Sequence, residues 1–344
     1  MSSSSNSLPD YSRWPAFWGR LVVAVSFVLI WFGGLVTTTD AGMAVPDWPN
    51  TYGYNMFAYP IYDWFFGPWD LFLEHGHRLL ATAAGFFSIV LLVVTWKRDS
   101  RPVMRRFAWF LLALVVFQGV LGGVRVLFDD RALAKIHGCV GPIFFVASVA
   151  FCVLASRWFY REVRGRTSAI EATRYFSRGH AAGMLGVSYL QLVIGAFIRH
   201  VGAEASMKGF LHLVYMHVGL AVLIVLGTLP YWLKTRKAGA EYQKLKTPVN
   251  ILALLVLVQF SLGLTTWVLK YGVPGWADRW EWTAQFVIRE KSFYQTILVT
   301  AHMATGSLIL AFWTVHVTRI WHFFDWSREA RRDILARAKT AEIG

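Results

Sequence analysis

Eight long apolar segments dominate the sequence and limit what it can fold into. They lie at about residues 21–38, 75–96, 107–126, 137–156, 180–198, 210–233, 248–269 and 293–317. Each approaches the roughly 20 residues that an α-helix needs to cross a bilayer. Because 56% of the 344 residues are hydrophobic and only 16% are charged, a soluble domain of this length is excluded. The sequence predicts an all-α membrane protein with eight transmembrane helices.

The positive charges are distributed unevenly between the two predicted sides of the membrane. If the termini and alternate loops share one side, that side holds most of the 34 Lys and Arg residues, as in 97–106, 157–166 and 234–244. The positive-inside rule then predicts cytoplasmic N and C termini. A bacterial cell membrane is favoured over the mitochondrial inner membrane. This uneven distribution accounts for the net charge of +14, so membrane lipid is an expected partner and nucleic acid is not.

The N-terminal segment and the two cysteines indicate how the chain is processed and whether it forms disulfides. The serine-rich N-terminus has no charged segment leading into a cleavable apolar core, so residues 21–38 are interpreted as the first span and not as a signal peptide. Both cysteines, Cys139 and Cys152, lie in the fourth predicted span. A structural disulfide in an outer loop is therefore not expected.

A repeated pattern runs through the spans. The odd-numbered spans contain LIWFG, QGVLG, QLVIG and QFSLG, whose last residues are Gly33, Gly122, Gly195 and Gly263. The even-numbered spans each carry a histidine at a matching place, namely His77, His137, His217 and His302. The repeat predicts two pseudo-symmetric four-helix bundles, residues 1–166 and 167–344. The glycines themselves are explained by close helix approach, since small residues allow membrane helices to pack tightly.

The four histidines are the strongest functional candidates. An ionisable side chain inside a membrane is costly unless it is paired or ligated, although a lone histidine can also be a packing residue. Two imidazoles that face each other across a helical bundle can serve as the axial ligands of a haem iron. Zinc would require further N, S or O ligands, and no convincing set accompanies either pair. The pattern favours two haem sites.

The two predicted sites differ in their neighbours. Glu74, His77 and Arg78 fall at i, i+3 and i+4, so they share one helix face. The aligned residues of the second half are Val214, His217 and Val218. This difference suggests that the second site holds a cofactor while the first carries out chemistry. A solvated or capping carboxylate at the membrane rim is the alternative for Glu74.

Other polar residues have two possible roles. Arg78, Arg125 and Arg199 lie at the outer ends of spans, where a guanidinium could bind a haem propionate. They could equally be side chains that extend to the membrane surface. His75 and His212 are further possible ligands, but neither has a counterpart in the opposite half.

Two outer loops are expected to lie over the sites. Residues 39–73 are rich in Trp, Tyr and Phe and contain no Lys or Arg. They could form an interfacial aromatic belt or a lid over the N-terminal site. Residues 270–292, with Trp276, Trp280 and Trp282, would cover the other half.

Together, these motifs resemble a known family. The stretch EHGHR, read as Glu-x-x-His-Arg, KIHG at the fourth span, TAHMATG in the eighth, and GGLVTTTDAGMAVPDWPNTYG after the first are similar to haem A synthase. The resemblance implies a membrane oxidoreductase that oxidises a methyl group of haem O to a formyl group by successive hydroxylation, for the biogenesis of haem-copper terminal oxidases.

The resemblance also implies a role for each candidate residue. His217 and His302 would bind the iron of a haem b cofactor, and the substrate haem would lie between His77 and His137. Glu74 would be the catalytic residue beside the reacting edge. The implied partners are haem O, an unidentified electron donor, haem O synthase (a farnesyltransferase) and terminal oxidase assembly factors. Some family members carry a cysteine pair in the first outer loop, which this chain lacks.

Two other classes of function remain open at this stage. A di-haem b-type electron-transfer cytochrome would use both histidine pairs without altering either haem. A transporter or haem chaperone would explain the repeated halves. The cytochrome gives no reason for Glu74 to occur in only one half. Transporter repeats are often inverted, whereas four spans per half give both halves of this chain the same orientation.

Overall fold

Eight long helices form the protein, as the sequence predicts. The computed structural model describes residues 11–160, 171–201, 206–271 and 292–341. Within these residues, eight helices are long and apolar enough to cross a membrane. They are α1 (Arg13–Thr38), α3 (Trp69–Arg98), α4 (Pro102–Leu127), α5 (Arg131–Leu154), α8 (Arg178–Arg199), α9 (Met207–Thr235), α10 (Gln243–Tyr271) and α11 (Phe293–Ala341). The chain is therefore an all-helical, multi-pass membrane protein.

Most of these helices extend beyond the apolar segments because polar residues cap them. The side chain of Ser12 accepts a hydrogen bond from the N–H of Trp14 at the start of α1, and Asp130 accepts from two N–H groups at the start of α5. Such caps satisfy donors that have no partner within the helix. One difference matters for function: α3 begins at Trp69, so Glu74 lies in the second turn of a helix and not at its start.

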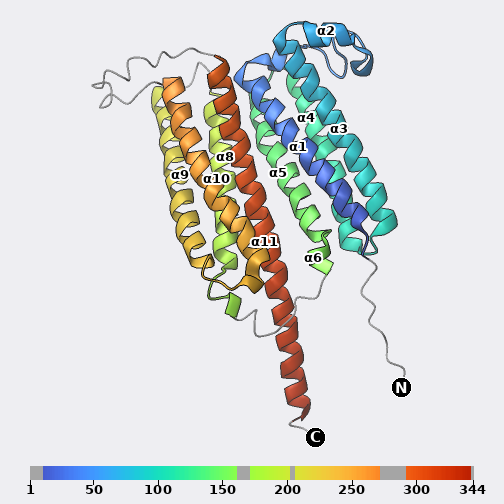
Figure 1. The fold of residues 1–344 in the computed structure, drawn as a ribbon. Coiled ribbons are helices and arrows are strands. Elements are labelled where there is room, and N and C mark those ends of the chain that lie inside the picture. The colour runs from blue at the N-terminus through green and yellow to red at the C-terminus, as the bar shows by residue number, and fades with distance from the viewer. Residues whose placement is uncertain (1–10, 161–170, 202–205, 272–291, 342–344) are drawn as a thin grey trace, which may run out of the picture.

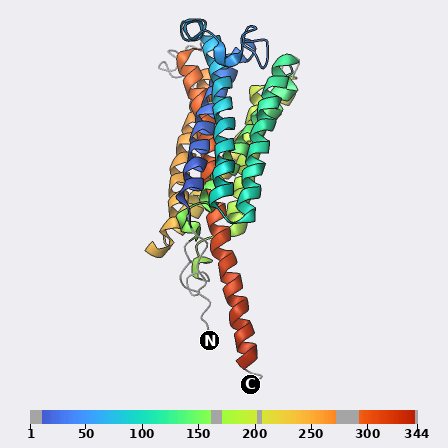
Figure 2. The same ribbon diagram turned by 90° about the vertical axis from the view of Figure 1, so that its right-hand side faces the viewer.

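The helices are arranged in two groups that stand side by side (Figure 1). One group contains α1, α3, α4 and α5, and the other contains α8 to α11; Figure 2 shows them from the side. Phe145 and Val149 of α5 share an apolar cluster with Ala311 of α11, which joins the two groups. The predicted boundary near residue 166 lies outside the described residues.

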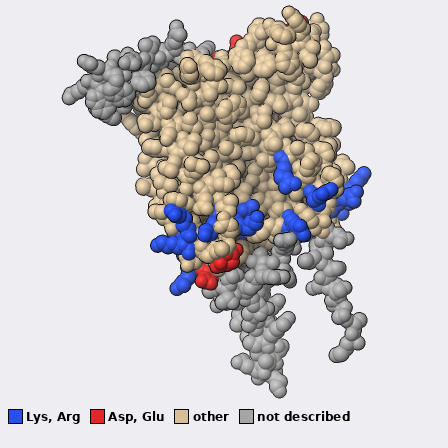
Figure 3. Space-filling view, viewed as in Figure 1, with Lys and Arg blue, Asp and Glu red and all other residues tan. Residues whose placement is uncertain are grey.

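The two ends of the bundle have opposite character. Lys and Arg side chains gather at the end where α1 begins, as the space-filling view shows (Figure 3). The other end carries the loop between α1 and α3, which includes η1 (Ala41–Met43), η2 (Met56–Ala58) and α2 (Ile61–Phe66). The predicted orientation would place the basic end in the cytoplasm. Two short elements at the basic end, α6 (Arg157–Tyr160) and η3 (Ala240–Tyr242), complete the described chain.

Candidate functional site

The structure brings the four predicted histidines together in two pairs. His77 of α3 faces His137 of α5, with ring centroids 6.4 Å apart and ring planes inclined by 76°. His217 of α9 faces His302 of α11 in the same way, at 6.3 Å and 61°. Each pair lies within one group of helices, so the two groups carry one pair each.

The spacing of each pair fits two imidazoles on one iron. With a metal–imidazole bond of about 2.0–2.1 Å and a ring radius of about 1.1 Å, two axial imidazoles have centroids roughly 6.3 Å apart. In all four histidines Nδ1 is buried and forms no hydrogen bond of normal geometry with the described residues. Among the described residues, no three His, Cys, Asp or Glu side chains cluster as metal ligands. A bis-imidazole haem fits this donor set better than zinc, which needs further ligands.

The four repeated glycines lie directly against the four histidines. A methyl group on the glycine would lie 3.0 to 3.1 Å from Cε1 of the facing ring in the pairs Gly33–His77, Gly122–His137, Gly195–His217 and Gly263–His302. Close approach of helices, the interpretation drawn from sequence, is therefore incomplete. The glycines make room for particular rings, a relationship that the shared spacing of the motifs could have revealed.

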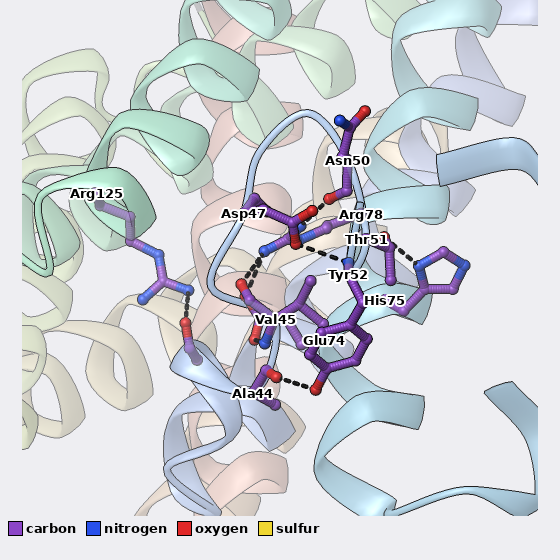
Figure 4. Close-up of polar contacts among 11 residues, drawn as sticks. Ala44, Val45, Asp47, Asn50, Thr51, Tyr52, Glu74, His75, Arg78 and Arg125 are labelled. Carbon is purple, nitrogen blue, oxygen red and sulfur yellow. Dashed lines mark hydrogen bonds and ion pairs between the residues drawn. The ribbon is translucent and has the colours of Figure 1, made fainter. Parts of the chain in front are cut away.

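Glu74 is buried beneath the outer loop (Figure 4). It is only 2% exposed. The N–H of Val45 donates to Oε2 of Glu74 at 2.8 Å, and Nη2 of Arg78 donates to Oε1, also at 2.8 Å. The alternative of a solvated carboxylate at the rim is wrong, since the loop removes this group from water.

Arg78 holds the outer loop in place. Its Nη1 donates to the carbonyls of Asp47 at 2.6 Å and Asn50 at 2.9 Å, and its Nη2 donates to the carbonyl of Val45 at 2.7 Å. With Glu74 as a fourth acceptor, the two terminal nitrogens each make two hydrogen bonds to protein. A propionate could reach these nitrogens only by displacing one of those partners.

A tight turn within the loop is organised by Asp47. The N–H groups of Tyr52 and Gly53 donate to its two carboxylate oxygens at 2.8 and 2.7 Å. Partial burial raises the pKa of Asp47, but these backbone hydrogen bonds outweigh that effect and hold the pKa below its ordinary value. Gly53 has a φ of 79°, a left-handed conformation that glycine adopts without strain. The charged form of Asp47 therefore stabilises the turn.

His75 and His212 lie away from the histidine pairs. Nδ1 of His75 shares a hydrogen bond of 3.0 Å with Oγ1 of Thr51, and its ring packs against Tyr59 and Trp64 of the loop. His212 is exposed on α9, with Nδ1 2.6 Å from the carbonyl of Lys208. The structure thus places His75 against the outer loop and His212 at the surface.

Arg125 and Arg199 form no ion pair with any Asp or Glu among the described residues. Nη2 of Arg125 donates to the carbonyl of Gly42 at 3.2 Å. Nη2 of Arg199 donates to Oγ1 of Thr38 at 2.5 Å, so this α8 residue reaches across to α1. Nε of Arg199 is buried and has no described partner. A buried guanidinium of this kind favours an anion as its ligand.

Two other predictions concern groups outside the pairs. Cys139 and Cys152 are both free thiols on α5. The second outer loop and its tryptophans, within 272–291, lie outside the described residues.

The eight membrane helices and the two facing histidine pairs define the class of protein. It is a helical membrane protein with two candidate haem centres. A family model described as "Cytochrome oxidase assembly protein" matches residues 68–214, which include Glu74, His77 and His137. Matches to whole proteins extend further along the chain. Over residues 68–214 the chain therefore resembles the cytochrome oxidase assembly protein family.

Relatives that align with most of the chain carry the name heme A synthase. The protein of Shouchella clausii is 25% identical over 291 residues, which cover 79% of this chain and 92% of the relative. That of Geobacillus thermodenitrificans is 24% identical over 306 residues, covering 86% of this chain and 81% of the relative. The Alkalihalophilus pseudofirmus protein is 24% identical, covering 68% and 80%. The resemblance predicted from the motifs is confirmed over most of the chain.

Proposed function

We propose that this protein is a haem A synthase, a membrane oxidoreductase that converts haem O to haem A by oxidising a ring methyl group to a formyl group. The observation that carries the proposal is the presence of two histidine pairs with the spacing of haem ligands, at 6.4 and 6.3 Å. The relatives named heme A synthase, aligned over most of the chain, support it. The product would serve the assembly of terminal oxidases.

The two pairs take different roles in this proposal. His217 and His302 would hold a haem b cofactor, which supplies iron redox chemistry when bound. His77 and His137 would hold the substrate haem. We assign the two roles from the residues that surround each pair. Among the described residues, Glu74, Arg78 and the outer loop lie near the first pair only. A site that must act on its haem needs such groups, whereas a site that only holds one does not.

Glu74 is the residue assigned to the chemistry. It lies three residues before His77 on α3, so the two side chains point toward the same face. Val45 and Arg78 fix the carboxylate through one hydrogen bond to each oxygen. A fixed carboxylate can stabilise positive charge, or accept a proton at either oxygen, as the methyl group is oxidised.

The loop over residues 39–68 would act as a lid on the substrate site. Its Trp48 occupies the space that a side chain at position 123 would take, so the loop reaches α4 beside Gly122 and His137. Arg78 and Arg125 bind backbone carbonyls of the same loop. A lid that excludes water protects a reactive intermediate, a role that a surface belt of aromatic residues would not provide.

The guanidinium groups of Arg125 and Arg199 are the proposed propionate contacts. Each lies at the outer end of its helix, and neither forms an ion pair with a described residue. Arg125 belongs to the group that holds the first histidine pair, and Arg199 to the other group. Arg78 is a weaker candidate, since its terminal nitrogens already bind the loop and Glu74.

The proposed partners follow from this chemistry. They are haem O as substrate, the surrounding lipid, an electron donor, haem O synthase and terminal oxidase assembly factors. A di-haem electron-transfer cytochrome is the second candidate, because it would use the same two pairs. It gives no reason for Glu74 and Arg78 to be buried at one pair and replaced by Val214 and Val218 at the other.

The pigment of the purified protein tests the proposal. The full chain would be expressed in a cell that makes haem O, and its porphyrins extracted and identified by mass. We expect haem b together with haem A or a hydroxylated haem O. Two equivalents of unmodified haem b would contradict the proposal and favour the electron-transfer cytochrome.

A further inference from the structure

Each of the four histidines lies in a notch on the helix that packs beside it. The notch consists of a glycine, against which Cε1 and Nδ1 of the ring lie, and of the backbone carbonyl one helical turn earlier. The sets are His77 with Gly33 and Leu29, His137 with Gly122 and Gln118, His217 with Gly195 and Gln191, and His302 with Gly263 and Gln259. The same three-part arrangement therefore occurs four times.

Helix geometry explains why the residue must be glycine. A side chain on an α-helix leans toward the N-terminus and covers the turn before it. At Gly33 the covered group would be the carbonyl of Leu29, four residues earlier. Without a Cβ this carbonyl is open to the neighbouring helix, and it retains a second lone pair for an incoming donor. A methyl group at Gly33 would instead lie 3.0 Å from Cε1 of His77.

The chemistry of a ligating histidine needs such an acceptor. When one ring nitrogen binds a metal, the other usually donates its N–H to a carboxylate or a backbone carbonyl, and this bond fixes the tautomer and the ring orientation. In all four histidines Nδ1 is buried and has no hydrogen-bond partner of normal geometry among the described residues. The carbonyl in the notch is the group placed to receive that proton.

We propose that the four glycines are positioning residues for the haem ligands. Each lets Nδ1–H of the facing histidine donate to the exposed helix carbonyl, and so directs Nε2 toward the iron. The inference rests on the proposed binding of haem, but it requires no oxidation of haem O. It assigns a function to Gly33, Gly122, Gly195 and Gly263 that helix packing alone does not explain.

Other glycines in the same helices provide matched controls. Gly119 lies three residues before Gly122 on α4, and Gly186 lies nine residues before Gly195 on α8. No described atom beyond the neighbouring backbone lies within 4 Å of a Cβ built at Gly119 or Gly186. Alanine at either control therefore changes helix propensity in the same way without touching a histidine.

The test compares Gly195→Ala with Gly186→Ala in the purified, haem-loaded full chain. The readouts are haem b affinity and the ferric low-spin EPR spectrum, whose anisotropy depends on the angle between the axial rings, 61° for His217 and His302. We expect Gly195→Ala to shift the largest g value and to weaken haem b binding by about 10–100-fold, the usual cost of losing an outer-shell partner. Gly186→Ala should match the wild type in both.

The outcomes separate positioning from packing. A Gly195→Ala protein with wild-type affinity and EPR spectrum would overturn the inference. If that variant does not fold, Gly263→Ala on α10 gives the same comparison for His302. Loss of folding in both variants, with Gly186→Ala intact, would assign the glycines to helix packing and also overturn it. A wild-type chain that binds no haem b would overturn both proposals, whereas a haem-loaded chain that leaves haem O unchanged would overturn only the proposed function.

Discussion

Glu74 and Arg78 form a buried ion pair of 2.8 Å on α3, one helical turn apart, and the outer loop closes over both side chains. The pair lies beside His77, in the helix group that carries the first histidine pair. Since the aligned residues near His217 are valines, the ion pair marks the difference between the two candidate haem sites.

Replacing Glu74 by glutamine should block the oxidation while preserving the fold. Glu74→Gln keeps the size of the side chain and an acceptor for the N–H of Val45, but it removes the charge and the ability to accept a proton. We expect the rate of haem A formation to fall by about 10²–10⁴-fold, the usual contribution of a positioned acid or base. Haem O or a hydroxylated intermediate should accumulate, as measured by pigment extraction from membranes.

The haem b content of the same variant serves as its control. It should stay at the wild-type level, because Glu74 lies in the other helix group from His217 and His302. Normal haem A formation would remove Glu74 from the mechanism, and combined loss of haem b and haem A would make it a structural residue.

The two histidine pairs should respond differently to alanine. We expect His217→Ala and His302→Ala each to abolish the haem b absorbance, since losing a ligand should weaken binding by more than the roughly 10–100-fold that loss of an outer-shell partner costs. The His77→Ala variant should retain most of the haem b absorbance. Absorption spectra of the purified variants provide the measurement, and equal loss in all three would show that cofactor and substrate sites are wrongly assigned.

The turn around Asp47 should loosen in acid. Because its pKa is lowered in the folded loop, the stabilisation by Asp47 is fully present above the ordinary value of 3.8 and is lost as the pH falls through the lowered value. Protection of the Tyr52 and Gly53 amides against hydrogen exchange should therefore decrease as the pH falls below about 4. In Asp47→Asn the protection should be low throughout; wild-type protection that is independent of pH would contradict this role.

The orientation in the membrane can be tested with single cysteines at two exposed positions. Asp63 lies on α2, at the end opposite the basic residues, and Ser100 lies between α3 and α4 at the basic end. In a chain with Cys139 and Cys152 replaced by serine, an impermeant reagent added to intact cells should label Asp63→Cys only. Labelling of Ser100→Cys from outside would reverse the predicted topology.

The sequence predicted the helices and the histidine pairs because both leave side-chain patterns. Apolar segments of membrane length predict spans directly, and the recurrence of His77, His137, His217 and His302 indicates which spans face each other. Polar caps lie outside such segments, so the predicted helix ends were short, and α3 begins six residues earlier than expected.

The contacts of the outer loop could not be predicted in the same way. Arg78 binds the backbone carbonyls of Val45, Asp47 and Asn50, and any residue type provides a carbonyl. Only the folded path of the loop decides which carbonyls converge on the guanidinium. For the same reason the burial of Glu74, which depends on that loop, became visible only in the structure.

Conversion of added haem O by the reconstituted protein tests the central claim most directly. Wild-type protein loaded with haem b would be placed in lipid vesicles with haem O, a chemical reductant and oxygen, beside a His77→Ala/His137→Ala double variant. Mass analysis of the extracted haems should show hydroxylated haem O and then haem A in the wild type, and unchanged haem O in the variant. Haem O that stays unaltered with the haem-b-loaded wild type would contradict the assignment of this protein as a haem A synthase.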